Sequence, residues 1–209
     1  MVFDFKKEYK DLYQPKTAPE VIDVPEMLFI MVDGTGNPNT SEEYQTAVEI
    51  LYGLSYAIKM CKVGGNLPVG YFDFVVPPLE GLWRLSDGSE AWKDKDRYCW
   101  TSMIRQPQFV DAAVFESAKT ELAKKKPLLD SSRARLVSLT EGLCVQAMHI
   151  GSYDDEPMTN AAIDQYIADN GYASDISDKR RHHEIYLNDP RKTASEKLKT
   201  IIRHPVRLV

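Results

Sequence analysis

The sequence has few of the features by which many protein classes are recognised. Cysteine occurs only at Cys61, Cys99 and Cys144 and never as CxxC, so we expect reduced thiols in a cytoplasmic protein. No stretch approaches the roughly twenty apolar residues of a membrane helix, and the N-terminus lacks the apolar core of a signal peptide. With a net charge of −5, the chain has no basic excess for holding phosphates, so direct nucleic-acid binding is not expected.

Nucleotide-binding and nucleophile motifs are also missing. Gly34-Thr35-Gly36 begins like a dinucleotide-binding loop, but Asn39 stands where the third glycine is required, and no GK[ST] follows. The segment is therefore better interpreted as a plain turn. No serine or cysteine lies in a recognisable nucleophile elbow.

A metal site is not favoured either. His182 and Glu184 share one face of an expected strand and could supply two ligands. Only generic candidates, His149 and Asp154, are available as a third ligand. We therefore predict no metal and no cofactor.

What the sequence does contain is a faint internal repeat. Met31-Val32-Asp33-Gly34 is echoed by Met148-His149-Ile150-Gly151, and Met103-Ile104-Arg105-Gln106-Pro107 by Ile201-Ile202-Arg203-His204-Pro205. Short matches also arise by chance, but these keep their order along the chain. They predict an α+β fold of duplicated βαββ units, related by a pseudo-twofold axis and forming a central ligand groove.

The repeat suggests a division of the chain. We expect an N-terminal extension over residues 1–20, extended and without a fold of its own, and a ligand-binding domain over residues 21–209. Within that domain the repeats cover about 26–107 and 134–209. A helix capped by Asp111 and ending in Lys124-Lys125-Lys126 joins them.

Local patterns place most of the elements. Thr40 and Glu43 form a capping-box pattern for a long helix that is expected to run to about Lys62 and to be closed by Gly64-Gly65-Asn66. Pro157 suits the first turn of a later helix that Gly171 ends. Strands are expected at 27–32, 69–76, 99–105 and 182–187 and at the C-terminus, with a hairpin formed by 135–140 and 143–150.

A carboxylate among aromatic residues is the best candidate for a site. When Pro190 is aligned with Pro77, Glu184 falls opposite Tyr71, which predicts a carboxylate and a phenol at related positions across the groove. Burial among aromatic rings would raise the pKa of Glu184. The aromatic faces would hold flat or cationic molecules. Equally, these rings could be core, with Glu184 at a strand edge. The candidate walls are Trp83, Trp100, Phe74, Tyr153 and Tyr186.

Four strings in order give the sequence a family resemblance. Together they resemble stand-alone GyrI-like proteins, which are similar to the drug-binding domains of multidrug-responsive transcription activators but lack the DNA-binding part. The resemblance covers nearly the whole chain from about Glu20. The strings are Val76 to Trp83, Trp100 to Pro107, Met148 to Pro157 and His182 to Pro190.

This resemblance implies the same duplicated fold and a glutamate on the last long strand, which corresponds here to Glu184. By motif position it adds Glu80 and Met148 to the ligand-binding residues. Some GyrI-like proteins are hydrolases that add water to the strained cyclopropane of DNA-alkylating natural products. In such an enzyme Glu184 would act on water as a general base, and Tyr71 would donate a hydrogen bond to the oxygen that gains charge.

We therefore expect a cytoplasmic protein, monomeric or homodimeric, that either sequesters planar aromatic or cationic xenobiotics as a multidrug-binding protein or detoxifies them by hydrolysis. The alternative is a non-catalytic regulatory protein that acts through protein contacts, like an inhibitor of DNA gyrase. Ligand affinity favours the first, and co-purification with a partner protein favours the second.

Overall fold

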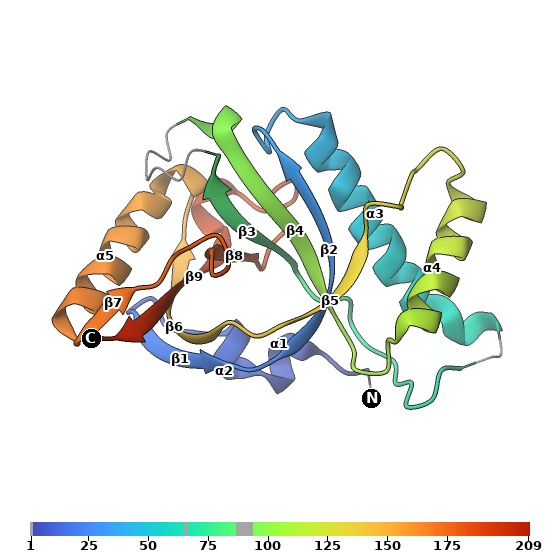
Figure 1. Cartoon of the computed structure of the whole chain (residues 1–209), viewed down its shortest axis with the longest axis horizontal. Coiled ribbons are helices and arrows are strands. Elements are labelled where there is room, and N and C mark those ends of the chain that lie inside the picture. The colour runs from blue at the N-terminus through green and yellow to red at the C-terminus, as the bar shows by residue number, and fades with distance from the viewer. Residues whose placement is uncertain (1, 65–66, 87–93) are drawn as a thin grey trace. The chain divides into compact units, whose positions relative to one another are not determined.

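The order of helices and strands repeats once along the chain (Figure 1). This order confirms the predicted α+β fold of two βαββ units. In the computed structural model, which describes residues 2–64, 67–86 and 94–209, the first copy consists of β2 (Met27–Thr35), α3 (Glu42–Lys59), β3 (Leu79–Leu85) and β4 (Tyr98–Gln106). The second consists of β6 (Gly142–Ile150), α5 (Glu156–Asp169), β8 (His182–Tyr186) and β9 (Lys199–Leu208).

Further elements surround the two copies. They are α1 (Phe5–Glu8), α2 (Lys10–Tyr13), β1 (Glu20–Val24), α4 (Ala112–Lys125), β5 (Arg135–Leu139), β7 (Tyr172–Ser174) and short 3₁₀ turns at Met60–Gly64, Lys95–Arg97, Tyr153–Asp155 and Ser195–Lys197. The expectation of a purely extended N-terminus is wrong at α1 and α2. The expected helix end at Gly64-Gly65-Asn66 falls partly on residues 65 and 66, outside the described residues.

The chain divides into two units. Unit 1 contains Met1–Phe5, Met27–Pro77 and Leu85–Leu139, and unit 2 contains Lys6–Glu26, Pro78–Arg84 and Thr140–Val209. The predicted groove and the predicted domain boundaries stay predictions.

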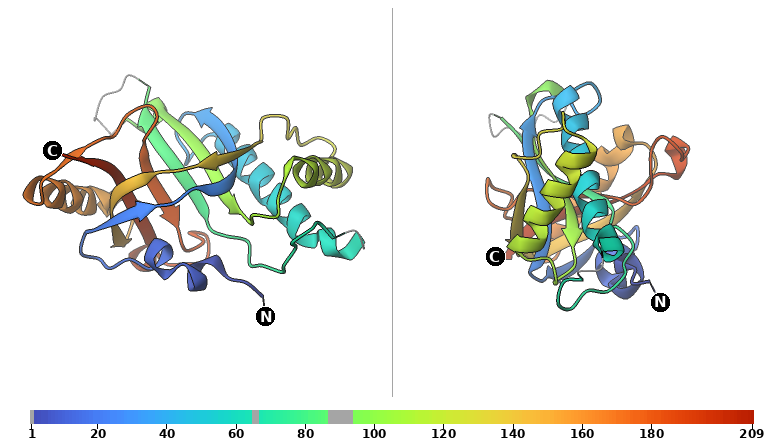
Figure 2. Two further views of the ribbon diagram at one scale, coloured as in Figure 1. Left: turned by 60° about the horizontal axis from the view of Figure 1, so that its bottom comes forward. Right: turned by 90° about the vertical axis from the view of Figure 1, so that its right-hand side faces the viewer.

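Unit 1 is built around β2, which pairs antiparallel with β4 on one side and β5 on the other. Helix α3 packs on β2 and β4, and α4 packs on α3 (Figure 2). Asp111 caps α4 as predicted, because its carboxylate accepts the Val114 backbone N–H at 2.8 Å. The cap of α3 is Ser41 instead of Thr40, with the Ser41 hydroxyl accepting the Tyr44 N–H at 3.2 Å.

The strand expected over 69–76 is absent. Only Phe74 forms an isolated bridge, to Phe3. The phenylalanines of this segment do not alternate across a sheet but gather in one aromatic cluster of unit 1, where the Phe72 and Phe109 ring centroids lie 5.4 Å apart. The Lys59 ammonium donates to the Phe74 carbonyl, so this backbone is satisfied without a neighbouring strand.

Unit 2 contains strands in the order β1, β6, β9, β8, β3, with β7 added to β9. The predicted hairpin of residues 135–140 and 143–150 is wrong, because β5 pairs with β2 whereas β6 pairs with β1 and β9. Helix α5 covers one face, where Ile163 and Ile167 pack against Val145, Ala147 and Ile202. Pro157 lies in the first turn of α5, and Gly171 follows its end with a φ of 75°.

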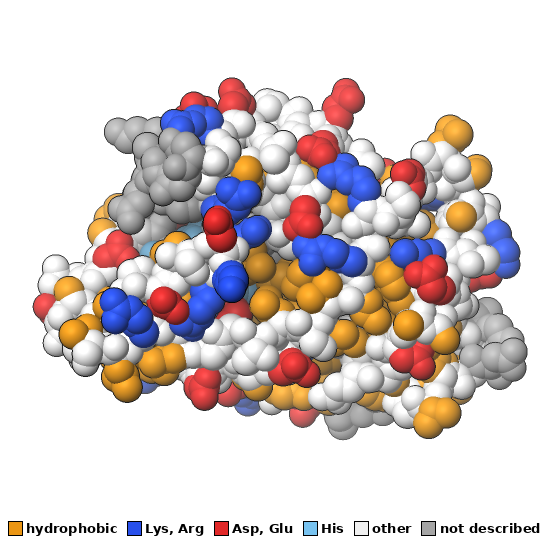
Figure 3. Space-filling model, in the orientation of Figure 1, with side chains coloured by type: hydrophobic (Ala, Val, Ile, Leu, Met, Phe, Trp, Pro, Cys, Tyr) orange, Lys and Arg blue, Asp and Glu red, His pale blue; other side chains and the backbone are white. Residues whose placement is uncertain are grey.

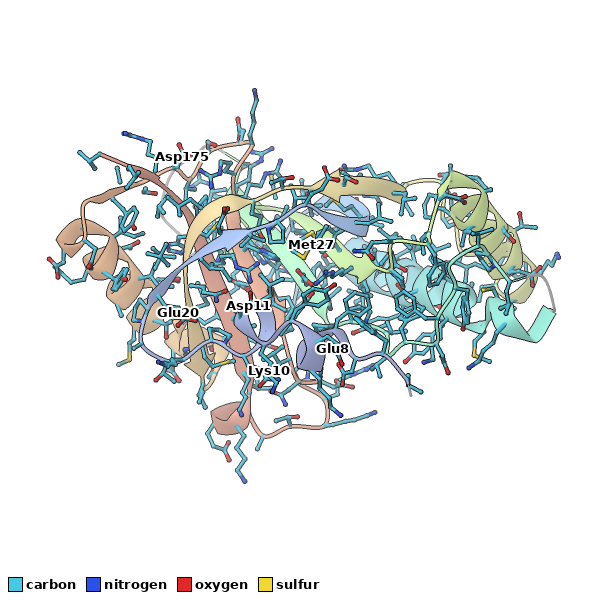
Figure 4. All side chains as sticks on the ribbon, turned by 90° about the horizontal axis from the view of Figure 1, so that it is seen from below. Glu8, Lys10, Asp11, Glu20, Met27 and Asp175 are labelled. Atoms are coloured by element: carbon cyan, nitrogen blue, oxygen red, sulfur yellow. The ribbon has the colours of Figure 1, made fainter. Side chains whose placement is uncertain are left out.

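Within unit 2, the segment that carries α2 packs against β6. Its backbone accepts hydrogen bonds from β6: the Met148 N–H donates to the Lys16 carbonyl at 2.8 Å, and the Gln146 amide donates to the Asp11 carbonyl at 2.7 Å. Figure 4 shows Asp11 of α2 and Glu20 of β1 in this region. Leu12 and Tyr13 are buried there.

The surface carries charges of both signs, with Lys and Arg side chains interspersed among Asp and Glu on the face seen in Figure 3. Within the described ranges, none of the helices combines the length and the apolar composition that a bilayer crossing requires.

Candidate functional site

Strand β8 presents two different sets of side chains on its two faces. Because side chains alternate along a strand, His182, Glu184 and Tyr186 share one face, and His183 and Ile185 share the other. On β3, the partners in register with Glu184 and His182 are Gly81 and Trp83. We call the group of His182, Glu184, Tyr186 and Trp83 the glutamate site.

Two donors hold the Glu184 carboxylate. His182 Nε2 lies 2.8 Å from Oε1, and the Tyr186 hydroxyl donates to Oε2 at 2.6 Å. Burial alone would raise the pKa of Glu184, but the hydrogen bonds from His182 and Tyr186 and the His182 charge hold that pKa below its ordinary value. The expectation of a raised pKa is therefore wrong, because the sequence did not reveal that both donors converge on one carboxylate.

Two further aromatic residues contact Tyr186, which donates to this carboxylate. The Trp83 indole N–H donates to the Tyr186 hydroxyl at 3.0 Å, and the Tyr153 ring meets the Tyr186 ring edge-on with centroids 5.8 Å apart. Burial and the nearby charges of Glu156, Glu184 and Asp189 raise the pKa of Tyr153 to about 12. Tyr153 therefore keeps its proton and can act as a hydrogen-bond donor.

Gly81 permits the position of Trp83. A Cβ at residue 81 would lie 2.6 Å from Trp83 Nε1. We expect Gly81→Ala to displace the indole from Tyr186 and to lower the free energy of unfolding by about 1–3 kcal/mol. Chemical denaturation followed by tryptophan fluorescence measures both effects. Gly171→Ala is a control without steric contact, since nothing lies within 4 Å of a Cβ there; its positive φ still costs some backbone strain. An unchanged tryptophan emission spectrum of folded Gly81→Ala would contradict this packing.

The opposite face of β8 holds a buried ion cluster. His183 lies 3.0 Å from Glu80 through Nε2 and 2.9 Å from Glu141 through Nδ1, and Arg203 lies 2.9 Å from Glu141. The Tyr13 hydroxyl donates to Glu80 at 3.3 Å. Glu80, predicted to bind ligand, is thus placed on the face away from Glu184, with partners inside the fold.

The predicted residues of unit 1 have other surroundings. The Tyr71 hydroxyl donates to the Lys59 carbonyl at 3.0 Å. The strand that was to align Tyr71 with Glu184 does not form, and in the repeated order β8 corresponds to β3. Trp100 is 1% exposed, in edge-on contact with Tyr44, and covers Gly34 so closely that a Cβ there would lie 2.2 Å from its ring. Phe74 is fully buried in the aromatic cluster.

The remaining predicted residues lie in unit 2. Met148 is half-buried on β6, in register with Ile201 of β9. His149 bonds to Thr159 and to the Ser152 carbonyl, both at 2.9 Å, and so fixes the turn before α5. Among the residues that the structure describes, no group of three or more His, Cys, Asp or Glu is arranged to hold a metal ion.

Sequence reasoning missed two residues that extend the glutamate site. His182 Nδ1 lies 2.9 Å from His204 Nε2, and His204 Nδ1 lies 3.3 Å from Asp164 Oδ1. His204 was noted only as part of the repeat. Asp164 gives no signal in the sequence, because its contact depends on how α5 lies on the sheet.

Comparison with known proteins agrees with this architecture. A hydrolase from Listeria innocua is 51% identical, with a TM-score of 0.90 over 98% of this chain and 100% of that chain. An uncharacterized conserved protein from the same organism is 53% identical, with a TM-score of 0.94 over the same shares. The EcmrR C-terminal domain, at 14% identity and a TM-score of 0.54 over 91% of this chain and 98% of that one, shares the fold.

A comparison with curated proteins gave no significant match. The model of the GyrI-like small molecule binding domain matches residues 17–207. With two βαββ units in the predicted order and a match over nearly its whole length, the chain belongs to the GyrI-like small molecule binding domain family.

Proposed function

We propose that this protein is a hydrolase that uses no cofactor and adds water to planar, hydrophobic molecules bearing a strained, electrophilic ring. The observation that carries the proposal is the Glu184 carboxylate, kept ionised and aimed by His182 and Tyr186 beside aromatic rings. The 51% identical hydrolase from Listeria innocua, covered over its full length, supports this reaction type.

The proposed reaction needs one base and one stabilised oxygen. Water attacks the ring carbon, a carbon–oxygen bond forms, and the strained carbon–carbon bond breaks. Its electron pair moves to a conjugated carbonyl oxygen of the ligand, and Glu184 takes the proton from water. The new oxyanion then takes a proton from solvent, and Glu184 releases its own, so the sum of the reaction is addition of one water.

Tyr153 is the phenol beside Glu184 that fits the role first assigned to Tyr71. Its raised pKa keeps the hydroxyl protonated, so it can donate to the oxygen that gains charge. Tyr186 already donates to Glu184 and accepts from Trp83, which makes it an orienting group. Trp83 and Tyr153 offer apolar surface for flat ligands, whose binding gains from stacking and, for cations, from cation–π attraction.

The direct test uses a cyclopropane-bearing alkylator in ¹⁸O-labelled water. The purified protein is expected to release a ring-opened product that carries one ¹⁸O, well above the buffer rate. Binding without any product would show that this is a binding protein and not a hydrolase.

Removing the Tyr186 hydroxyl should separate orientation from binding. Tyr186→Phe keeps the ring but leaves Glu184 with one donor, so we expect kcat to fall about tenfold or more while dye affinity changes little. Steady-state kinetics and dye titration measure the two quantities. Tyr172→Phe, a tyrosine on β7, serves as the control. An unchanged kcat in Tyr186→Phe would remove Tyr186 from the mechanism.

A further inference from the structure

Four polar side chains form one line of hydrogen bonds from the glutamate site to the surface of unit 2. Glu184 bonds to His182 at 2.8 Å, His182 to His204 at 2.9 Å, and His204 to Asp164 at 3.3 Å. The His182 and His204 side chains are 7% and 6% exposed, whereas that of Asp164 is 65% exposed. The Glu184 side chain is 15% exposed, so the line begins at a largely covered carboxylate and ends at one in contact with water.

The fold fixes this line through three elements. His183 and Arg203 are paired on β8 and β9, which brings the neighbouring His182 and His204 opposite each other on the face that carries Glu184. Their rings lie 5.0 Å apart. Helix α5 covers this face through Ile163 and places the adjacent Asp164 at His204.

Counting protons determines the charge of the line. An ionised carboxylate only accepts hydrogen bonds, so both Glu184 and Asp164 require a proton on the histidine nitrogen that faces them. The bond between His182 and His204 requires one more. Three protons on two imidazoles make one positive charge, because a neutral imidazole carries a single N–H.

The single charge belongs on the histidine next to Glu184. The hydrogen bond to Asp164 requires a proton on His204 Nδ1. Burial and the His182 charge lower the pKa of His204, and this lowered pKa opposes a second proton on Nε2. His204 Nε2 then accepts from His182 Nδ1. In this assignment His182 donates through both ring nitrogens, to His204 and to Glu184.

We propose that Asp164 is a positioning residue which, through His204, keeps His182 doubly protonated and thereby keeps Glu184 ionised. The catalytic consequence of this arrangement rests on the proposed function of Glu184. The arrangement itself is a property of the free protein. A carboxylate on the surface of α5 sets the charge state of a partly buried carboxylate on β8, with two histidines between them.

Other charged and neutral groups also lie near the line. Tyr186 on β8 and Trp83 on β3 are neutral groups of the glutamate site, and Glu156 and Asp189 act on Tyr153. On the far face of β8, His183 and Arg203 pair with Glu80 and Glu141, and the His183 charge also helps to lower the pKa of Glu184. Asp164 lies 3.3 Å from His204 Nδ1, so its charge reaches His182 through His204.

The test is Asp164→Asn, with Asp164→Glu as the conservative variant. Asp169→Asn is the control, since Asp169 is on the same helix and accepts from Gln165. In ligand-free protein, ¹⁵N NMR of the imidazoles should show His182 with two bonded protons in the wild type and one in Asp164→Asn. The titration of Glu184, followed by ¹³C NMR of its carboxyl group, should move up by about one pH unit or more. Asp164→Glu and Asp169→Asn should behave like the wild type.

With a substrate, the acidic limb of the pH–rate profile should move up by the same amount in Asp164→Asn, while KM at high pH stays unchanged. If Asp164→Asn leaves the His182 and Glu184 resonances as in the wild type, the proposal is overturned. The wild type could also fail to turn over the substrate while Asp164→Asn still changes the His182 and Glu184 resonances. That result would refute only the hydrolase function and would support the coupling between Asp164 and Glu184.

Discussion

Glu184→Gln is expected to lower kcat for ring opening by about 10²–10⁴-fold, the range that general-base catalysis contributes. The substitution keeps the size of the side chain but removes the charge that takes the proton from water. It also turns an amide N–H₂ toward one of the two donors that Glu184 now accepts, His182 or Tyr186. The measurement is product formation under single-turnover conditions.

Ligand binding should respond in a different way. The dissociation constant of a cationic dye should rise in Glu184→Gln, whereas that of a neutral dye of the same shape should change little, because only the Coulomb term is lost. Glu196→Gln, on an exposed turn of unit 2, is the control. Equal losses for both dyes would mean that Glu184 acts by packing.

The lowered pKa of Glu184 also fixes the shape of the pH profile. Its ordinary pKa is 4.5 and the hydrogen bonds hold it below that value. Loss of activity from protonating Glu184 should therefore lie below about pH 4.5, and this limb should be absent between pH 5 and 8. A rate that climbs steadily from pH 5 to 8 would require a base other than Glu184.

The second large effect concerns the buried ion cluster of Glu80, Glu141, His183 and Arg203. Glu141→Gln should lower the free energy of unfolding by roughly 3–5 kcal/mol, because it leaves two buried cations with a single carboxylate. Both cations contact Glu141 at 2.9 Å. Chemical denaturation at neutral pH measures the loss, and Glu26→Gln, exposed in unit 2, should cost almost nothing. A loss below 1 kcal/mol in Glu141→Gln would contradict the cluster.

The same cluster should make stability depend on pH. Although burial opposes it, the charges and hydrogen bonds of Glu141 and Glu80 raise the pKa of His183 from 6.5 to about 9. A raised pKa stabilises the folded state fully below pH 6.5, and this stabilisation is lost as pH rises to about 9. At about 1.4 kcal/mol for each pKa unit, the loss is roughly 3 kcal/mol. His183→Gln should flatten this part of the curve.

The acidic side follows the opposite rule. The pKa of Glu141 is lowered to about 2, against burial, by the charges of His183 and Arg203. Its stabilising contribution is therefore complete above pH 4.5 and is lost as pH falls toward 2.

Much of the fold could be predicted, because it depends on local patterns. The apolar run at β2, the Asp111 cap and Pro157 in the first turn of α5 are signals that a few neighbouring residues carry. The strand predicted over 69–76 was wrong. Aromatic and β-branched residues favour strands in general, whereas the aromatic rings of this segment pack in a cluster with Phe109. The hairpin prediction was wrong because two strands that are adjacent in sequence, here β5 and β6, need not pair with each other.

The site was predictable only in part. Glu184, Tyr186, Trp83 and Tyr153 do gather within unit 2, and their spacing and motif positions pointed to them. The pairing of Glu184 with Tyr71 relied on aligned prolines, but β8 corresponds in the repeat to β3, where Gly81 is in register with Glu184. Asp164 and His204 are distant in sequence from Glu184, and only the packing of α5 and β9 joins them to it.

Because side chains alternate along β8, its two faces differ in how freely their residues can be substituted. His183 belongs to the ion cluster, so its identity is tied to Glu80, Glu141 and Arg203 together. Tyr186, on the other face, contacts Glu184, Trp83 and Tyr153. A library that varies Tyr186 and the neighbouring Trp83 and Tyr153 can therefore change ligand preference while the scaffold stays constant, and a register shift of one residue would exchange the two roles and abolish both.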